Sequence, residues 1–236
     1  MAYNKFYRVY SLLERRDTEI RTDEICNKDE IETKVLLWSY IFDLSADCDI
    51  KLSSALRIAS QYPHVLDQIN KYITYGYTEM PISLFLVYDD KEQYVSCDAI
   101  RKFIIRYNGL FEKTGLYIDE DQGDACYLWE YLWEVTRILV NINLPSRFYA
   151  RKFLKSISDA EDFLERYGNG SIISEVEIIN GEYEEFDMEW ITNVPINSTY
   201  YEAIEFAKNY WNKKQTTNPI IETVFTGTYK LKDVTD

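Results

Sequence analysis

The chain has 236 residues, of which 46% are hydrophobic and 28% charged, and its formal net charge is −14. This composition is typical of a folded protein with a hydrophobic core and excludes an intrinsically disordered chain. No apolar run reaches the roughly 18 residues of a membrane span, and residues 1–6 lack the apolar stretch of a signal peptide, so we expect a cytoplasmic protein. The negative charge disfavours non-specific binding to nucleic-acid phosphates.

Neither cysteine nor histidine forms a recognisable reactive or metal-binding pattern. The cysteines are widely spaced, with no C-x-x-C pair, so we expect reduced thiols and no zinc site. They are Cys26, Cys48, Cys97 and Cys126. Ser-His-Asp or Cys-His catalysis would depend on His64, the single histidine, and nothing around it suggests such a site. Rossmann and P-loop glycine motifs are also absent from the sequence.

The first 140 residues begin with a strand and continue mostly as helices. Aromatic and β-branched residues predict the strand at 5–12, and the charged stretch 14–33 favours a loop or a frayed helix. Apolar residues recur at helical spacing over 34–140, where Pro63 is expected to break a helix. The run 81–88 fits either a strand or a buried helical turn, and its periodicity does not decide between them.

Two helices are expected before the last third of the chain. One covers 98–107, with Asp98 as its N-cap residue. The other covers 125–140, where apolar residues occupy a broad face that is typical of a deeply buried helix. Between them, Gly115 and the acidic segment 119–124 indicate loops.

The pattern changes after Pro145 to alternating helices and strands. Ser158 and Glu161 have capping-box spacing for a helix over 159–167. Asn169-Gly170 is a turn signal, and alternating residues predict a half-exposed strand at 174–179.

Thr199 and Glu202 repeat the capping-box spacing before a helix. The β-branched segment 219–225 predicts a strand, and Gly227 is expected to turn the chain into another strand at 228–232. The whole plan is α+β. We expect one domain over 1–236, with a mostly helical insertion at 34–124.

Glu222 is the carboxylate that stands out by its position. It interrupts the otherwise apolar run Pro219–Phe225. A glutamate on a half-exposed strand is ordinary, because the solvent face tolerates it. The motifs around it give it more weight. Elsewhere in this acidic chain, a small cationic cluster is either a solvated face or a phosphate contact; its members are Arg147, Arg151, Lys152 and Lys155.

The last third of the chain presents a series of motifs in a fixed order: Pro145-Ser146-Arg147, a helix with Asp159-Ala160, the strand 174–179, Phe186-Asp187-Met188-Glu189-Trp190, Ala207-Lys208-Asn209-Tyr210-Trp211, and Glu222 through Gly227. This order resembles an ADP-ribosyltransferase-like family of bacteria and phages, catalogued as a domain of unknown function. Phe6-Tyr7-Arg8-Val9 resembles the opening strand of the family. The resemblance covers residues 3–12 and 125–232 and leaves 34–124 uncovered.

This resemblance implies a split two-sheet fold with a cleft that holds NAD⁺ as co-substrate. It makes Glu222 the catalytic residue, in contact with the nicotinamide ribose. The residues that it implies for NAD⁺ binding are Arg8, Ser146, Arg147, Tyr149 and Phe153. Arg8, where the family usually has histidine, would grip the dinucleotide. Tyr149 or Phe153 would stack near the nicotinamide.

The chemistry accounts for these residue types. Breaking the nicotinamide–ribose bond creates an oxocarbenium-like cation, which a carboxylate stabilises. Arginine suits the diphosphate through bidentate contacts. Relatives that modify arginine often carry Glu or Gln at the position of Ile220, so we favour another acceptor, such as a nucleobase. Asp187 and Glu189 are candidate bases for it.

Three functions therefore stay open. The first is ADP-ribosyl transfer to a macromolecule, as a toxin or phage-conflict effector with a protein antitoxin that docks on the tyrosine-rich insertion. The second is a non-catalytic acidic binding protein or inhibitor. The third is an NAD⁺ glycohydrolase, with water as the acceptor. The feature that discriminates the enzyme hypotheses from the binding protein is whether Arg8, Tyr149 and Glu222 converge on one cleft, and a Glu222 that points to bulk solvent away from Arg8 would contradict an enzyme.

Overall fold

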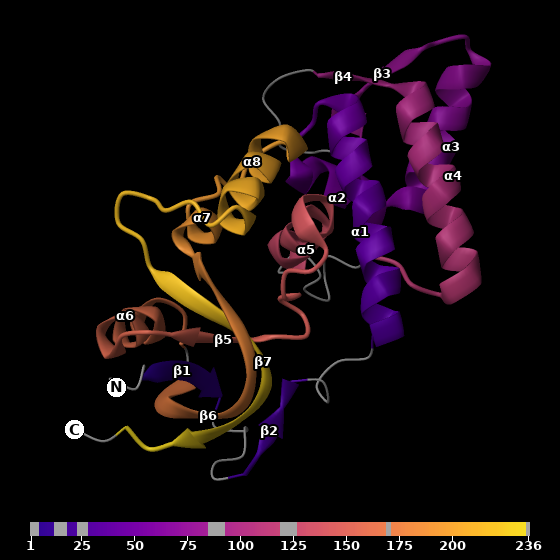
Figure 1. Ribbon diagram of the computed structural model, residues 1–236. Coiled ribbons are helices and arrows are strands. Elements are labelled where there is room, and N and C mark those ends of the chain that lie inside the picture. Colours follow the sequence, from indigo (N-terminus) through magenta and orange to yellow (C-terminus); the bar gives the residue numbers. More distant parts are fainter. Residues whose placement is uncertain are drawn as a thin grey trace. The chain divides into compact units, whose positions relative to one another are not determined.

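The computed structural model describes residues 5–11, 18–22, 28–84, 93–118, 127–168 and 171–234. The chain divides into two compact units (Figure 1). The sheet unit comprises Met1–Lys28, Thr136–Asn193 and Ala207–Asp236, and the helical unit comprises Asp29–Val135 and Val194–Phe206. Several predictions lie outside the described residues: Cys26, Cys126, the acidic segment 119–124, the Asn169-Gly170 turn and the end of the run 81–88.

In the sheet unit, five antiparallel strands form one small closed sheet. They are β1 (Phe6–Ser11), β2 (Ile20–Arg21), β5 (Arg151–Leu154), β6 (Ser171–Asp187) and β7 (Ile221–Lys232). Their order is β2-β7-β5-β1-β6, and β6 also pairs with β7, which closes the sheet into a barrel. The mixed α and β character is confirmed. The five strands of the sheet unit form one continuous sheet, whereas the family resemblance implies a split into two sheets.

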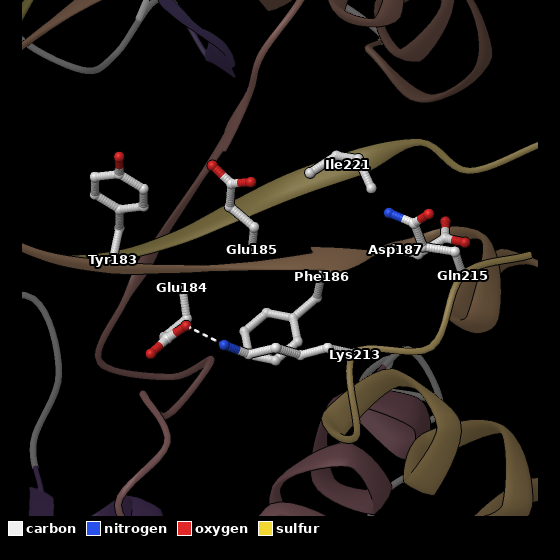
Figure 2. A pocket seen from close by; sticks show the side chains of 8 residues that line it. All are labelled: Tyr183, Glu184, Glu185, Phe186, Asp187, Lys213, Gln215 and Ile221. Atoms are coloured by element: carbon white, nitrogen blue, oxygen red, sulfur yellow. Dashed lines mark hydrogen bonds and ion pairs between the residues drawn. The ribbon is translucent and has the colours of Figure 1, made fainter.

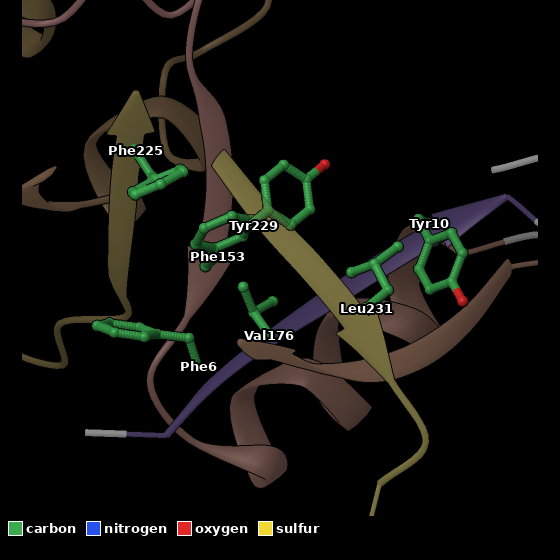
Figure 3. Packing of buried hydrophobic residues seen from close by; sticks show 7 residues of the cluster. All are labelled: Phe6, Tyr10, Phe153, Val176, Phe225, Tyr229 and Leu231. Carbon is green, nitrogen blue, oxygen red and sulfur yellow. The ribbon is translucent and has the colours of Figure 1, made fainter. Parts of the chain in front are cut away.

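Side chains alternate between the interior of this barrel and its outer face. The interior holds an aromatic cluster built around Phe6, Tyr10, Phe153, Phe225 and Tyr229 (Figure 3). Successive strand residues point to opposite faces, so the residues between these belong to the outer face.

The outer face of the barrel has its own apolar cluster. It contains Tyr7 from β1 and Leu154 from β5, which are ladder partners. Ala160 packs into this cluster from helix α6 (Ile157–Tyr167), which therefore covers part of the outer face.

The helical unit contains α1 (Lys28–Cys48), α2 (Leu52–Ser60), α3 (Tyr62–Thr74), α4 (Cys97–Thr114) and a two-stranded sheet of β3 (Glu79–Pro81) and β4 (Tyr94–Ser96). A 3₁₀ turn, η2 (Ile82–Leu84), occupies the start of the ambiguous run. Helices α5 (Leu128–Asn141) and α8 (Tyr200–Trp211) contribute residues to both units, and the short α7 (Glu189–Thr192) belongs to the sheet unit.

Two predicted helix caps are wrong by two residues. The hydroxyl of Ser96, not the carboxylate of Asp98, accepts the Ala99 amide at the start of α4. At the start of α6, Ser156 accepts the Asp159 amide, and Ser158 lies inside the helix. In both cases a serine earlier in the chain has the extended backbone that an N-cap residue needs.

Two other helix boundaries agree with the sequence. The Thr199–Glu202 capping box is confirmed, because the Glu202 carboxylate accepts the Thr199 amide at 2.8 Å. The predicted break at Pro63 is also confirmed: α2 ends at Ser60 and α3 begins at Tyr62. Pro63 lies in the first turn of the new helix, where a missing amide proton costs nothing.

Gly227 does not turn the chain, because β7 runs straight through it. It pairs with Gly181 on β6, and their φ angles are +144° and +141°. A Cβ on Gly181 would lie 2.3 Å from the Thr226 carbonyl oxygen, and one on Gly227 would lie 2.3 Å from the Asn180 carbonyl oxygen. Two glycines facing each other therefore let β6 and β7 approach closely at this point.

Gly181→Ala should lower the free energy of unfolding by about 1–3 kcal/mol, because alanine is strained at this φ and meets the facing strand. Gly109→Ala is the control. Gly109 lies inside α4 with nothing within 4 Å of an added Cβ, so alanine should stabilise by about 0.5–1 kcal/mol. Urea unfolding measures both. Equal effects of the two substitutions would contradict the close approach at Gly181.

Candidate functional site

Arg147, Tyr210 and Glu222 meet in the sheet unit. The Arg147 guanidinium donates to the Tyr210 hydroxyl oxygen at 2.6 Å and forms an ion pair with Oε1 of Glu222. The Tyr210 hydroxyl donates to the same Oε1 at 2.8 Å. Their exposed fractions are 6%, 0% and 4%. We call this buried group the Arg–Tyr–Glu cluster.

Three separate elements supply its members. Arg147 lies in the turn between α5 and β5, Tyr210 in the last turn of α8, and Glu222 at the second position of β7. On the sheet, Glu222 is the ladder partner of Leu154 on one side and of Phe186 on the other. Its side chain therefore lies on the outer face, with theirs.

Aromatic rings enclose the cluster and keep its polarity low. Phe186 stacks on Tyr210 with centroids 4.6 Å apart, and Trp211 meets both rings edge-on at 5.0 and 4.8 Å. Charged side chains in such surroundings have lost their hydration, so each must be compensated by an ion pair or a hydrogen bond to the other. Burial raises the pKa of Tyr210 well above its usual value; Arg147 opposes this and Glu222 adds to it. Tyr210 is therefore neutral, keeps its proton and donates a hydrogen bond to Glu222.

The turn before β5 holds Arg147 in place. Ser146 is buried, and its backbone carbonyl accepts the Ala150 amide at 3.0 Å. Just upstream, the Arg137 guanidinium donates to the carbonyls of Ile142 and Leu144 at 2.6 and 2.8 Å. The Ser146 carbonyl thus stabilises the turn, and Arg137 holds the segment that leads into it. Sequence reasoning gave Arg137 no such role, because its partners are backbone oxygens rather than side chains.

Arg8 lies on the other side of the sheet from Glu222. It is 9% exposed, and its guanidinium donates to the Tyr229 hydroxyl inside the barrel, 5.7 Å from the ring centroid. Because its β1 neighbours Phe6 and Tyr10 belong to the interior cluster, Arg8 faces inward with them. The expectation that Arg8 and Glu222 line one cleft therefore fails in this structure.

The two candidates for stacking on nicotinamide are not part of the cluster. Phe153 is fully buried inside the barrel, where its ring contacts Phe225 at 5.3 Å and Tyr229 at 5.2 Å between centroids. Tyr149 is half-buried, and its hydroxyl lies 3.4 Å from the Lys28 carbonyl oxygen. Of the residues expected at the site, the structure brings Arg147 and Glu222 together, with Ser146 beside them.

Asp187 has a structural role instead of that of a free base. It is buried and accepts four hydrogen bonds: from the Thr216 amide and hydroxyl at 2.7 Å each, and from the amides of Glu189 and Ile220 at 3.1 Å. These bonds hold the segment that leads into β7, and so they position Glu222 indirectly. The carboxylate of Glu189 accepts hydrogen bonds from the Thr192 hydroxyl and the Asn193 amide side chain at the end of α7.

A pocket of about 390 Å³ opens along the end of β6 (Figure 2). Its walls are residues 183–187, Lys213, Gln215 and Ile221. Phe186 belongs both to this wall and to the aromatic enclosure of Tyr210. Lys213 forms an ion pair with Glu184 and lies 5.9 Å above the Phe186 ring. The pocket is thus mainly acidic and separated from the Arg–Tyr–Glu cluster by one ring.

The cationic cluster of the sequence is only partly solvated. Lys155 pairs with Glu185 at 2.8 Å, and Arg147 is buried in the Arg–Tyr–Glu cluster.

Comparison with protein-family models finds no match, and comparison with curated proteins finds none either. Within the described ranges, no helix is long and apolar enough to cross a membrane, and no group of three or more His, Cys, Asp or Glu could hold a metal ion.

Arg147→Leu should lower the free energy of unfolding by about 3–5 kcal/mol, because it leaves the Glu222 carboxylate buried without its cation. The double variant Arg147→Leu/Glu222→Leu should regain most of that loss, because no charge then remains to be solvated. Lys232→Leu is the control: its ion pair with Glu177 is exposed at 2.9 Å, so the change should stay within about 1 kcal/mol. If Arg147→Leu lowers the free energy of unfolding by no more than this control does, the ion pair with Glu222 is not desolvated in the folded protein.

Tyr210→Phe should change the dependence of stability on alkaline pH. Above a pH of about 10 the unfolded chain releases the Tyr210 proton and the folded chain keeps it, so wild type loses stability as pH rises. The variant lacks this contribution. Its disadvantage at neutral pH should shrink by about 1.4 kcal/mol per pH unit above 10. Urea unfolding at a series of alkaline pH values measures it, and a constant difference would refute the buried, neutral Tyr210.

Proposed function

We propose that the chain is an NAD⁺-dependent ADP-ribosyltransferase with a macromolecular acceptor, built on an ADP-ribosyltransferase-like fold with an insertion at 34–124. One observation carries the proposal. Three separate motifs of the family resemblance contribute Arg147, Tyr210 and Glu222 to one buried cluster. A buried ion pair adds little to stability, and perturbed titratable groups concentrate at functional sites. The convergence therefore supports a functional role.

In the proposed reaction, Glu222 faces the ribose next to nicotinamide. The bond between C1′ and the nicotinamide nitrogen breaks, and its electron pair leaves with nicotinamide. The Glu222 carboxylate stabilises the positive charge that develops on the ribose. A nucleophile of the acceptor then bonds to C1′ and releases its proton to water. Tyr210 keeps the carboxylate oriented throughout by donating its hydroxyl proton.

Arg147 is the residue that fits the diphosphate of NAD⁺. Its planar guanidinium can bind phosphate oxygens in a bidentate manner. The guanidinium must turn away from Glu222 to do so, and this exchange opens the carboxylate to the ribose. Arg8 does not fit the same role, because it lies on the opposite face of the sheet.

A second candidate, a non-catalytic acidic binding protein on the same fold, is favoured by the closure of Glu222. Its carboxylate is 4% exposed, with Arg147 and Tyr210 on it, and Arg8 is remote from it. In this alternative the cluster is a remnant that maintains the turn before β5. The two candidates differ in one property, the ability to cleave NAD⁺.

Nicotinamide release from NAD⁺ by the purified full chain tests the proposal. Glu222→Gln, which keeps the shape of the side chain, should lower the rate by about 10²–10³. Glu177→Gln is the matched control, since Glu177 lies exposed on β6 in an ion pair with Lys232. It should leave the rate unchanged. Circular dichroism checks that both variants fold.

The acceptor class follows from the same assay with added RNA, DNA or protein extract. Release that rises with one addition identifies the acceptor. Release without any acceptor, still dependent on Glu222, indicates a glycohydrolase. If wild type neither releases nicotinamide nor binds NAD⁺ in calorimetry, the enzyme proposal is overturned and the non-catalytic candidate takes its place.

A further inference from the structure

The C-terminal half of β6 is paired along one edge only. Val176 has a partner on each side, Phe6 of β1 and Leu231 of β7, so these two strands pair with opposite edges of β6. The pairing with β1 ends at Val176, whereas the pairing with β7 continues to Asp187. Among the residues that the structure describes, no strand pairs with the edge opposite β7 beyond Val176. We call this stretch the free edge of β6.

One hydrogen bond fixes which backbone groups lie on the free edge. The Met188 amide donates to the Ile220 carbonyl at 2.9 Å, directly beyond the last ladder pair of β6 and β7. Hydrogen-bonded and non-hydrogen-bonded pairs alternate in an antiparallel ladder, so Asp187, Glu185 and Tyr183 are in non-hydrogen-bonded pairs. Their amide and carbonyl groups therefore point away from β7, where no backbone hydrogen bond joins them to another described residue.

The pocket at the end of β6 runs along this free edge (Figure 2). It is lined by five consecutive residues, Tyr183–Asp187, and side chains in a strand alternate between its two faces. Because β7 covers the other edge, a pocket that touches both faces of β6 must lie along the free edge. Lys213, Gln215 and Ile221 complete its lining. Five strand residues span about 17 Å, which matches an extended segment of similar length.

The free edge is accessible from solvent up to the start of this pocket. Every residue from 179 to 183 is exposed, so neither face of the strand is covered there. Phe186 and Asp187 are buried at the closed end. An unpaired strand edge of this kind can accept a further strand from another chain through backbone hydrogen bonds.

Carboxylates dominate the side chains of the free edge. Glu182, Glu184 and Glu185 lie within four residues. Ion pairs join Glu184 to Lys213 and Glu185 to Lys155, and these four side chains are between 37% and 49% exposed, so solvent screens both pairs. Among the described residues, none forms an ion pair with Glu182. The edge therefore has negative charge left for a partner to neutralise.

This charge favours a basic occupant over a second copy of the protein. Two copies that paired through the same segment would bring glutamates opposite glutamates, and like charges on facing strands destabilise a sheet. A strand with basic side chains meets the opposite charge instead. The pocket already holds one such group from the chain itself. The Lys213 ammonium contacts the Glu184 carboxylate and lies 5.9 Å above the Phe186 ring.

We propose that the free edge of β6 from Gly181 to Glu185 binds an extended, basic segment of a partner protein as an added strand. The backbone of Tyr183 and Glu185 supplies the hydrogen bonds. Glu182 and Glu184 share one face of the strand, so basic side chains at alternate positions of the partner face both. This inference concerns the edge of β6 and does not depend on NAD⁺ chemistry at Glu222.

Fluorescence anisotropy of the purified full chain tests the added strand at physiological ionic strength. The probe is a labelled octapeptide of alternating threonine and lysine, blocked at both ends, and it should bind saturably. The same peptide with every backbone amide N-methylated keeps its charges but cannot donate to the β6 carbonyls. It should bind about tenfold more weakly. An octapeptide of alternating threonine and glutamate should not bind.

Two substitutions at Glu185 separate the backbone contribution from the charge. Both Glu185→Pro and Glu185→Thr remove the carboxylate, but only proline removes the amide donor. Because this amide points away from β7, proline leaves the ladder with β7 intact. Glu185→Pro should bind the lysine peptide about fivefold more weakly than Glu185→Thr does. Glu182→Gln, which keeps the backbone, should weaken binding by about twofold through charge alone.

Four results would overturn the proposal. Equal binding of the plain and N-methylated peptides would mean attraction by charge without an added strand. Equal binding by the two Glu185 variants would place the peptide elsewhere. No binding of the lysine peptide would leave the carboxylates as protection of the edge against aggregation. A dimer in ultracentrifugation that Glu185→Pro alone disrupts would assign the edge to a second copy. Circular dichroism shows whether each variant folds, and the N-methylated peptide tests wild type independently of them.

Discussion

The ion pair of Arg147 and Glu222, completed by Tyr210, is the interaction on which the account of this protein depends. Two opposite charges beneath aromatic rings cannot recover the water they lose, so each requires the other and the tyrosine hydroxyl. Much of the surrounding architecture serves to bring them together. Ser146 shapes the turn that carries the arginine, and Asp187 holds the segment that leads to the glutamate.

Closure of the sheet sets the second constraint. In a closed antiparallel sheet every strand has one side chain inward and the next outward, so a shift of one position moves a residue to the other face. Arg8 falls on the inner side with the aromatic core, and Glu222 falls on the outer side with Leu154. Two residues that a linear motif places in the same site are thereby separated by the sheet itself. The cation that contacts Glu222 in this structure is Arg147.

Sequence patterns predicted where helices and strands occur better than they predicted where each one begins and which face of the sheet each side chain occupies. The strand at β1, the helices of the first half and the Thr199–Glu202 cap follow from local periodicity and spacing. The caps at Ser96 and Ser156 did not, since a nearby serine or aspartate competes for the same amide. The local sequence predicts a turn at Gly227, because nothing near it in the chain shows that it faces Gly181 across the sheet. Contacts of this kind depend on strand pairing, which no local pattern contains.

The most direct test of the central claim is a crystal structure of the protein with NAD⁺. The account predicts the nicotinamide ribose within hydrogen-bond distance of the Glu222 carboxylate, with Arg147 turned from Glu222 to the diphosphate. A dinucleotide bound through Arg8, or Glu222 still closed by Arg147 and Tyr210 at saturating NAD⁺, would contradict it.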